Sequence, residues 1–392
     1  MRIAVLTQFF PPETLAGANR VAALVQALAE VGEVRLAAPQ PSYPDPVAYV
    51  GAPEPQLPAG VHLARVAPFS AQSRSWPARA AAESAMAWHV ARAATAEPAD
   101  VVVASSPSMF LGPSGLVAAR RRRARYVWDL RDLTWEYGSE SGVVSGPVAR
   151  TAIGMLGRAM WWTARHADLV TCATSGLGVE LSRRLPGRRV EVIPNGIDAA
   201  LVEALDPTPP PASDHVRVLY AGLVGHAQGL DVLLDVARRA PDIRITIAGD
   251  GPRRESLERE ARTGGLANLV FTGYVPPAQL VGLYHDADVL FAQLLRSELH
   301  STTAAPSKLL EYMAAGRPIV YAGEGSAAEI VSSAGAGVVV PPGDADAVVH
   351  AIAGLDETER ERLGRAARAA AEASPTRVDH LRRLAALVAE LA

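Results

Sequence analysis

The chain has 392 residues, of which 49% are hydrophobic and 20% charged, and its formal net charge is −3. This length predicts two domains with ordinary apolar cores, and the balanced charge argues against nucleic acid as a partner. The single cysteine, Cys172, excludes an internal disulfide and fits a reducing cytoplasm, while the apolar runs are too short for a signal peptide or a membrane span of about 20 residues.

The first half of the chain alternates short β-rich runs with segments of helical periodicity. The runs cover residues 3–7, 34–38, 61–66, 100–106, 126–130, 169–174 and 190–194. Helical patterns lie between most of them, for example over residues 16–31 and 147–167. Apolar strands that alternate with helices predict a parallel sheet covered on both faces.

The rhythm breaks at residues 199–214, where the proline-rich stretch DPTPPPASD predicts a linker. It then restarts with β-rich runs at residues 216–222, 243–249, 269–273, 288–294, 318–323 and 337–343. The tail from Glu357 reads as two helices separated at residues 374–376. We therefore expect an N-terminal domain over residues 1–198, a second domain over 215–374, and a final helix over 375–392.

Glycines follow several of the expected strands, where ligands bind in sheets of this class. Gly17 precedes the first helix, and a glycine there lets the backbone approach an anion at the helix N-terminus. Similar turns in the second half contain Gly222, Gly225, Gly229, Gly249, Gly251 and Gly273, with His226 and Gln228 as side-chain donors. Each glycine alone is explained by a tight turn, but the series at one end of a sheet predicts a backbone-lined nucleotide pocket.

Lys308 is the only lysine among 38 basic residues and lies in the stretch APSKLLEYMAAGRP. Together with Ser307 it lies at the start of an expected helix. The helix macrodipole disfavours a cation at this end unless an anion lies between the lysine and the helix N-terminus. Glu311 follows one turn later on the same face. The alternative is a surface ion pair between Lys308 and Glu311 that contributes about 0.3 kcal/mol.

The motifs, taken in order, resemble a known family. They read QFFPPETLAGANR, WDLRDLTWE, VIPNGID, YAGLVGHAQGLDVL, IAGDGP, LVFTGYVP, PSKLLEYMAAGRPIV and GVVVPPGD, and they cover nearly the whole chain. The set resembles the retaining GT-B glycosyltransferases of family 4, and within them the bacterial amino-sugar transferases of surface polysaccharides. The resemblance implies an α/β fold of two doubly wound Rossmann-like domains that face a cleft, with the last helix crossing back to the first domain.

The resemblance also implies a nucleotide-sugar donor, bound mainly by the second domain, while the first binds the acceptor. Glu311 matches the ribose-binding glutamate, Ser307 and Lys308 match positions beside the diphosphate, and Tyr274 and Val275 match the loop that reads the base. The residues expected to bind the donor are Gly17, Gly222, Gln228, Gly249, Tyr274, Val275, Thr303, Ser307, Lys308, Leu309 and Glu311.

The sequence departs from the wider family at three positions. Many members have an arginine and a lysine where this chain has Leu223 and Gln228, and a glutamate where it has Thr303. Lys308 is then left with few cationic substitutes to neutralise the leaving diphosphate, with Arg20, Arg131 and Arg253 as possible helpers.

The expected reaction is transfer of a hexosyl or N-acetylhexosaminyl group with retention at the anomeric carbon. Lys308, Arg131 and Asp132 are the catalytic candidates, and Asp132 belongs to a polar cluster with Asp129 and Glu136. An Asp–Arg pair that closes a turn would also explain this cluster. The base loop favours a UDP-linked donor. A nucleotide-sugar epimerase and a catalytically silent nucleotide-binding protein remain the alternatives.

We expect neither a metal nor a cofactor, because the two DAD tripeptides lie at a strand start (Asp288) and a helix start (Asp344). The acceptor is expected to be a small molecule or a polyprenyl-linked sugar. The basic run Arg120–Arg125 and the pair Trp161–Trp162 suit contact with a membrane surface, but a helix C-terminus and a core-facing helix explain them equally well. The protein is placed in the cytoplasm, with peripheral contact at the inner face of the membrane left open, and the oligomeric state is not predicted.

Overall fold

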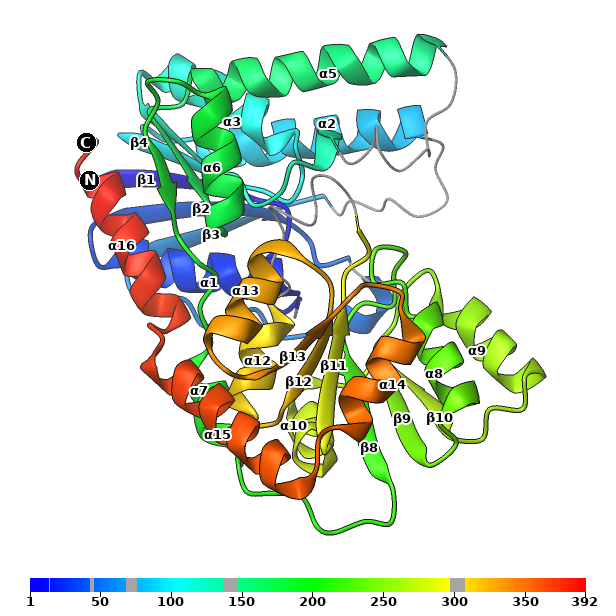
Figure 1. The fold of residues 1–392 in the computed structure, drawn as a ribbon. Helices are drawn as coiled ribbons and strands as arrows, with labels where there is room; N and C mark the ends of the chain where they lie inside the picture. Colours follow the sequence, from blue (N-terminus) through cyan, green and yellow to red (C-terminus); the bar gives the residue numbers. More distant parts are fainter. Residues whose placement is uncertain (14, 43–45, 68–75, 137–146, 297–306) are drawn as a thin grey trace. The chain divides into compact units, whose positions relative to one another are not determined.

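The computed structural model describes the chain except for residues 14, 43–45, 68–75, 137–146 and 297–306 (Figure 1). The chain divides into two compact units. Met1–Asn195 and Arg377–Ala392 form the first unit, and Gly196–Thr376 form the second. None of the helices in the described part of the chain is long and apolar enough to span a bilayer.

The first unit contains a seven-stranded sheet in the order β3-β2-β1-β4-β5-β6-β7, and all neighbouring strands are parallel. Every residue of β4 is buried, as expected for a strand covered on both faces. The strands are β1 (Arg2–Thr7), β2 (Glu33–Pro39), β3 (Val61–Val66), β4 (Val101–Ser105), β5 (Arg125–Asp129), β6 (Leu169–Cys172) and β7 (Val190–Val192).

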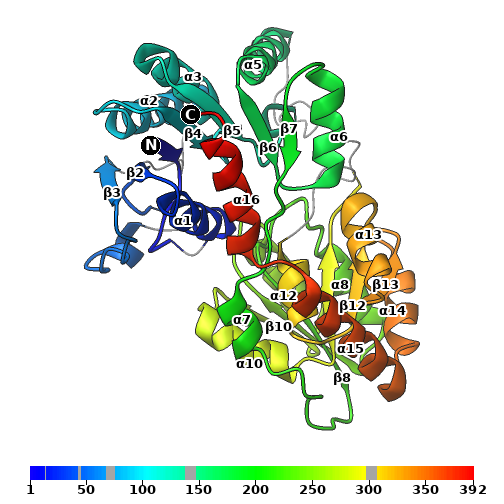
Figure 2. The same cartoon turned by 90° about the vertical axis from the view of Figure 1, so that its left-hand side faces the viewer.

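Helices cover the first sheet, and they include the last helix of the chain. They are α1 (Ala16–Ala29), the short 3-10 helix η1 (Pro46–Tyr49), α2 (Trp76–Ala94), α3 (Leu111–Arg122), α5 (Pro147–Arg165), α6 (Ser175–Arg184) and α16 (Arg377–Ala389). Figure 2 shows α16 beside α1, and Leu24, Leu28 and Leu384 belong to the apolar core that these helices share. An ion pair of 3.0 Å between Arg382 and Glu30 joins the same helices at the surface.

The second unit contains a six-stranded sheet in the order β10-β9-β8-β11-β12-β13, again with parallel neighbours. Its strands are β8 (Val216–Ala221), β9 (Ile243–Ala248), β10 (Leu269–Gly273), β11 (Val289–Gln293), β12 (Ile319–Ala322) and β13 (Gly337–Val340). Its helices are α7 (Ala199–Ala204), α8 (Asp231–Arg239), α9 (Arg254–Thr263), α10 (Pro277–Asp286), α12 (Lys308–Ala314), α13 (Gly325–Ser333), α14 (Ala345–Ala353) and α15 (Glu357–Ala373).

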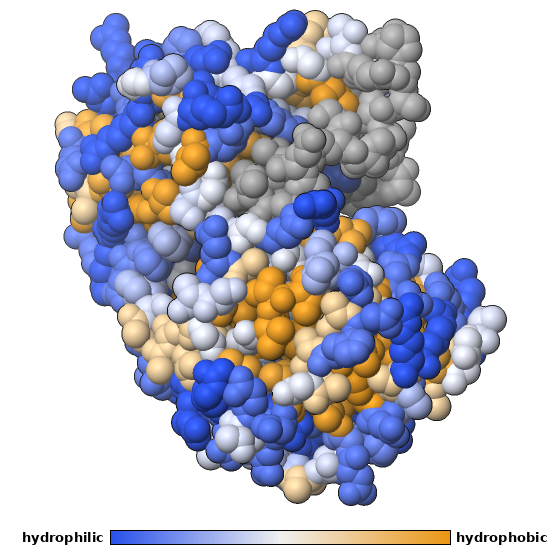
Figure 3. All heavy atoms as spheres, viewed as in Figure 1, coloured by the Kyte–Doolittle hydropathy of each residue, from blue (hydrophilic) through white to orange (hydrophobic). Residues whose placement is uncertain are grey.

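The edge strand β13 lies under an apolar part of the second unit's surface. Its residues Val338 and Val339 are half-buried. Figure 3 shows hydrophobic residues gathered over β13 and the neighbouring helices α13 and α14.

The α/β fold with two Rossmann-like sheets is confirmed, and each predicted strand is present in its predicted place. The segment expected to be a linker differs in its first part. Residues 199–204 form the helix α7, because the Asp198 side chain accepts a hydrogen bond of 3.0 Å from the Ala200 amide and starts a helix ahead of the prolines. The break between α15 and α16 falls at the predicted residues.

Candidate functional site

Loops at the carboxyl edge of the second sheet are joined by backbone hydrogen bonds. The Gly222 amide donates to the Ala248 carbonyl at 2.8 Å, and the Gly249 amide donates to the Gly273 carbonyl at 2.8 Å. Gly249 has φ +144°, and a Cβ there would lie 1.8 Å from the Gly222 carbonyl oxygen. Only glycine fits this approach, so β8, β9 and β10 end in one rim made of backbone.

Gln293 holds the neighbouring part of this rim, and the sequence reasoning missed it. It is buried at the end of β11, where its Nε2 donates to the carbonyls of Gln228 (3.1 Å) and Gly229 (2.6 Å). Its Oε1 accepts from the Gly343 amide at 2.9 Å. The available signal was a glutamine inside the apolar run VLFAQL, at the end of the predicted strand.

Lys308 is the first residue of α12, and its ammonium lies over an aromatic ring. The Nζ atom is 3.8 Å from the centroid of the Tyr220 ring. A Cβ on Gly222 would lie 2.6 Å from the same Nζ, so the glycine leaves room for the lysine. Within the described residues Lys308 forms no hydrogen bond or ion pair. Burial lowers the pKa of Lys308 to about 7, although the charge of Glu311 acts in the opposite direction.

Glu311 has a different partner from the one that the sequence allowed. The Tyr284 hydroxyl donates to Glu311 Oε2 at 2.9 Å. Burial, with the nearby charge of Glu311, raises the pKa of Tyr284 well above its ordinary value, so the phenol remains a donor. The surface ion pair between Lys308 and Glu311 is therefore wrong, because Tyr284 holds the carboxylate and the ammonium faces a ring.

The other donor-site candidates of the second unit have unequal access to a ligand. Tyr274 follows the bonded Gly273 and is exposed, whereas Val275 packs partly against the core. Ser307 is half-buried and its side chain makes no capping bond to α12. The side chain of Leu309 is buried in the core, so only its backbone is available for binding. Thr303 lies outside the described residues.

The polar cluster after β5 in the first unit is partly internal. Asp129 is fully buried and accepts from Arg20 Nε (3.1 Å) and Nη2 (2.9 Å), from Ser105 (2.8 Å) and from Thr171 (2.9 Å). These contacts lower the pKa of Asp129 against the effect of its burial. Asp129 is therefore an internal member of the predicted polar cluster, because Arg20 and the two hydroxyls occupy both its oxygens. Arg20 was a possible helper at the diphosphate, but its guanidinium is engaged in this buried ion pair with Asp129.

Arg131 and Asp132 follow this pair in sequence. The Arg131 amide donates to Ser106 Oγ at 2.9 Å, and burial lowers the pKa of its guanidinium while Asp132 raises it. A Cβ on Gly17 would lie 2.9 Å from Arg131 Nη1, so the glycine ahead of α1 makes room for this side chain. Arg131 Nε is buried and has no hydrogen-bond partner in the described part of the chain. The structure thus brings Gly17, Arg131 and Asp132 together.

Glu136 is drawn away from this group. It accepts from Trp161 Nε1 at 2.9 Å and is ion-paired with Arg184. Arg253, the remaining possible helper, is paired with Asp231 at 2.5 Å. Both residues are therefore engaged within their own unit. Among the described residues at the glycine rim, Lys308 is then the cation without a carboxylate partner.

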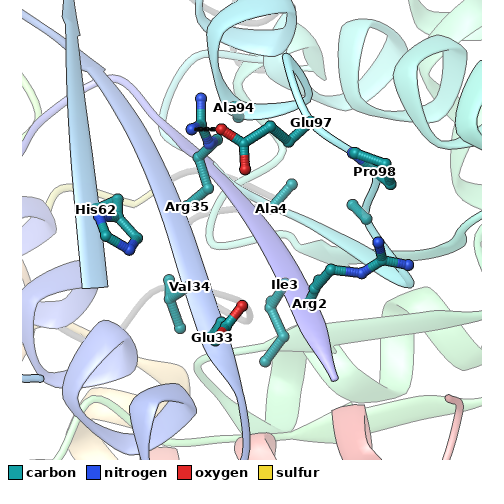
Figure 4. A pocket seen from close by; sticks show the side chains of 11 residues that line it. Arg2, Ile3, Ala4, Glu33, Val34, Arg35, His62, Ala94, Glu97 and Pro98 are labelled. Atoms are coloured by element: carbon teal, nitrogen blue, oxygen red, sulfur yellow. Dashed lines mark hydrogen bonds and ion pairs between the residues drawn. The ribbon is translucent and has the colours of Figure 1, made fainter. Parts of the chain in front are cut away.

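A pocket at the opposite edge of the first sheet is not part of the candidate site. Figure 4 shows its lining, which includes Arg2 and Glu33 at the first residues of β1 and β2, and the ion-paired Arg35 and Glu97. Ligands of such sheets bind at the carboxyl ends of the strands, and this pocket lies at the amino ends.

Two aspartates of the DAD tripeptides make contacts within the second unit. Asp288 Oδ2 pairs with Arg217 Nε at 2.9 Å, and the Asp344 side chain accepts from the Ala347 amide at 2.9 Å, which caps α14. Over the described ranges, no three His, Cys, Asp or Glu side chains form a group that could hold a metal ion.

Two Rossmann-like parallel sheets are typical of the GT-B fold, and the family comparisons identify the class of enzyme. Residues 16–196 match the family described as "Glycosyl transferase 4-like domain", and residues 203–370 match "Glycosyl transferases group 1". The chain belongs to the group 1 GT-B glycosyltransferases, with an N-terminal domain of the GT4-like type.

Among curated proteins, the chain is 30% identical to a GDP-mannose-dependent alpha-(1-6)-phosphatidylinositol monomannoside mannosyltransferase of Mycolicibacterium smegmatis, over 64% of the chain and 65% of that protein. It is 29% identical to a 2-deoxystreptamine N-acetyl-D-glucosaminyltransferase of Streptomyces fradiae, over 51% of the chain and 50% of that protein. The chain thus spans less than two thirds of the length of these relatives.

Among solved structures, sucrose-phosphate synthase of Thermosynechococcus elongatus superposes with a TM-score of 0.75 at 17% identity, covering 100% of this chain and 99% of that one. HepE of Anabaena, in complex with UDP and glucose, superposes with a TM-score of 0.69 at 16% identity and covers 98% of each chain. At these identities the structures establish the fold alone.

Proposed function

We propose that this protein transfers a hexosyl or N-acetylhexosaminyl group from a UDP-linked donor to an acceptor hydroxyl, with retention at the anomeric carbon. The observation that carries the proposal is Lys308, an ammonium with no carboxylate partner among the described residues, beside a rim of backbone at the carboxyl edge. A cation held in this way suits an anionic ligand, because the ligand would supply the missing counter-charge.

The donor is assigned to the second unit. Lys308 binds the diphosphate beside the glycine rim, and Glu311, oriented by Tyr284, binds the ribose. Tyr274 and Val275 present the loop that reads the base. Gln228 occupies the position of a second cation, and its side-chain amide donates a hydrogen bond to the diphosphate in place of a charge.

The chemical step then depends on charge stabilisation of the leaving group. As the bond to the anomeric carbon breaks, negative charge grows on the diphosphate, and Lys308 neutralises it in a partly desolvated place. A phosphate oxygen takes the proton of the acceptor hydroxyl on the same face of the sugar. We assign no metal and no cofactor to this step, and we place the activity in the cytoplasm.

Arg131 and Asp132 are assigned to the acceptor or to the transferring sugar. Arg131 has a buried Nε atom with no partner among the residues that the structure describes, and Asp132 is half-buried beside it. Asp132→Asn keeps the size of the side chain and removes its charge. We expect it to lower turnover by about 10²-fold if Asp132 contacts reacting groups, and full turnover would remove it from the mechanism.

A thermal-shift panel tests the donor assignment most simply, because a ligand stabilises the state that it binds. The panel contains UDP, GDP and TDP and their common sugar conjugates, each with the wild type and with Lys308→Ala. We expect UDP and one UDP-sugar to raise the melting temperature of the wild type and to have little effect on the variant. If only GDP stabilises the wild type, the donor carries guanosine instead of uridine, and the assignment of the diphosphate site to Lys308 still holds.

Product analysis then separates transfer from the two alternatives. A retaining transferase gives a product with the anomeric configuration of the donor. Conversion of one nucleotide sugar into another without an acceptor would indicate an epimerase. Tight UDP binding without hydrolysis or transfer for any donor would indicate a silent binding protein.

A further inference from the structure

The outward faces of α3 and α5 form one continuous surface in the first unit. The two helices contact each other, and a shallow depression between them is lined by Leu116, Val117, Arg120, Arg121 and Trp162. Figure 1 shows α5 lying along α3. Met155 and Arg158 lie on the same face of α5 as Trp162, two turns and one turn before it, and both are exposed. We call Val117, Arg120, Arg121, Met155, Arg158 and Trp162 the basic–aromatic face.

The adjacent residues Trp161 and Trp162 have different surroundings. Trp161 donates a hydrogen bond to Glu136, stacks edge-on with Trp135 at 5.6 Å, and lies under the Arg184 guanidinium at 4.8 Å. Trp162 packs only against the His166 ring at 4.2 Å among the described aromatic contacts and keeps 56% of its surface exposed. Met155 is 58% exposed and Val117 is 41% exposed beside it. The packing of the unit therefore explains Trp161 and leaves the exposure of Trp162 unexplained.

The charge of this face has one sign. Neither α3 nor α5 contains an aspartate or a glutamate. Arg120 and Arg158 are exposed and have no carboxylate partner within the described residues, and Arg121 lies over the Trp88 ring at 4.9 Å. Helix α15 of the second unit is different, because its exposed Arg362 and Arg365 pair with Glu359 and Glu361. The chain has a net charge of −3, so this cationic face is a local feature.

We propose that the basic–aromatic face docks the protein on an anionic phospholipid surface. Unpaired arginines attract acidic headgroups, and their apolar stems can lie along the interface while the guanidinium groups stay hydrated. An indole with an apolar body and a polar N–H is suited to the headgroup level of a bilayer, and Met155 and Val117 add apolar contact around it. The proposal concerns lipid binding alone and is independent of the donor site.

Vesicle flotation with the full chain tests the proposal. We expect the protein to float with vesicles of equal parts phosphatidylcholine and phosphatidylglycerol at low salt, to be released by high salt, and to stay behind with pure phosphatidylcholine. Removing two face cations by Arg120→Gln with Arg158→Gln should weaken partitioning by on the order of 20-fold, if each arginine near the surface contributes as usual. Trp162→Ala should weaken it several-fold.

Matched variants identify the face rather than overall charge or apolar exposure. Arg362→Gln with Arg365→Gln removes the same charge from α15, and Val179→Ser removes an apolar side chain that is 71% exposed on α6. Both controls should partition like the wild type. Equal partitioning of the face variants and their controls would overturn the proposal, as would equal binding to uncharged vesicles.

The remaining outcomes are also decisive. A dimer that depends on Trp162, together with no vesicle binding, would show that a second copy of the chain covers this face and would overturn the lipid assignment. The face variants should melt at the wild-type temperature and keep their thermal shift with UDP, because every altered side chain is exposed and none belongs to the donor site.

Discussion

Each unit places a cation close to the carboxyl edge of its sheet, and the two cations are held in opposite ways. In the first unit Arg20 meets Asp129 in a buried pair of 2.9 Å, with hydroxyls on both carboxylate oxygens. In the second unit Lys308 faces a ring and a glycine, and its pKa is lowered to about 7. A satisfied pair of this kind organises the fold, whereas an unsatisfied cation is available to a ligand.

Removing the unsatisfied cation should give the largest effect on activity. We expect Lys308→Ala to lower kcat by about 10²–10³-fold, because it removes the charge that stabilises the leaving diphosphate. Steady-state transfer assays measure this. The matched control is Arg254→Ala, which removes a cation at the same edge that already pairs with Asp250 at 2.9 Å. Equal losses in the two variants would contradict a special role for Lys308.

Breaking the satisfied pair should instead affect stability. Asp129→Ala leaves Arg20 buried and uncompensated, and we expect the free energy of unfolding of the first unit to fall by about 3–5 kcal/mol. Labelling of Cys172 in urea follows this unit alone, because the only cysteine is buried there and its thiol pKa is raised to about 12 by burial. Asp100→Ala, which breaks the exposed pair with Arg2, should cost at most about 1 kcal/mol.

A smaller effect should follow when Lys308 is displaced rather than removed. Gly222 has φ +137° and its Cβ position is occupied by the lysine, so we expect Gly222→Ala to weaken UDP binding by about tenfold. Gly265→Ala is the control, because Gly265 has φ +65° but nothing lies within 4 Å of its Cβ position. Calorimetric titration with UDP distinguishes them. If Gly265→Ala loses as much UDP affinity as Gly222→Ala, the loss is caused by backbone strain and not by displacement of Lys308.

The smallest expected change concerns Glu311. Tyr284→Phe removes the hydrogen bond of 2.9 Å that orients its carboxylate, and we expect UDP binding to weaken about fivefold. Pyrophosphate has no ribose, so its binding should be unchanged in this variant and lost in Lys308→Ala. If pyrophosphate binding also weakens in Tyr284→Phe, Glu311 does not act on the nucleoside separately.

The strands and the glycine turns could be predicted from the sequence, because apolar periodicity and strand-end glycines are local signals. The polar contacts that distinguish the two edges could not. Arg20 and Asp129 are 109 residues apart, and Tyr284 and Glu311 are 27 apart, so each pairing depends on how strands and helices lie beside one another. The same limit applies to Trp161 and Trp162, whose different surroundings follow from the packing of α5 on its neighbours.

The central claim is that Lys308 is an unsatisfied cation whose counter-charge comes from the donor. Because the chain contains one lysine, labelling lysine with 15N at Nζ gives a single signal whose titration reports this group alone. We expect a midpoint near the lowered pKa of about 7 in the free protein. With UDP bound, the nearby diphosphate should move it to about 9 or higher.

The same shift fixes the sign of two pH effects. Burial lowers the pKa in the folded state below that of the unfolded chain, so the wild type should gain stability relative to Lys308→Met as pH rises from about 7 to about 10.5. UDP affinity should fall over the lower part of this range, because binding then requires proton uptake. A midpoint near 7 that rises with UDP supports the account, and an ordinary lysine midpoint above 10 that UDP leaves unchanged would contradict it.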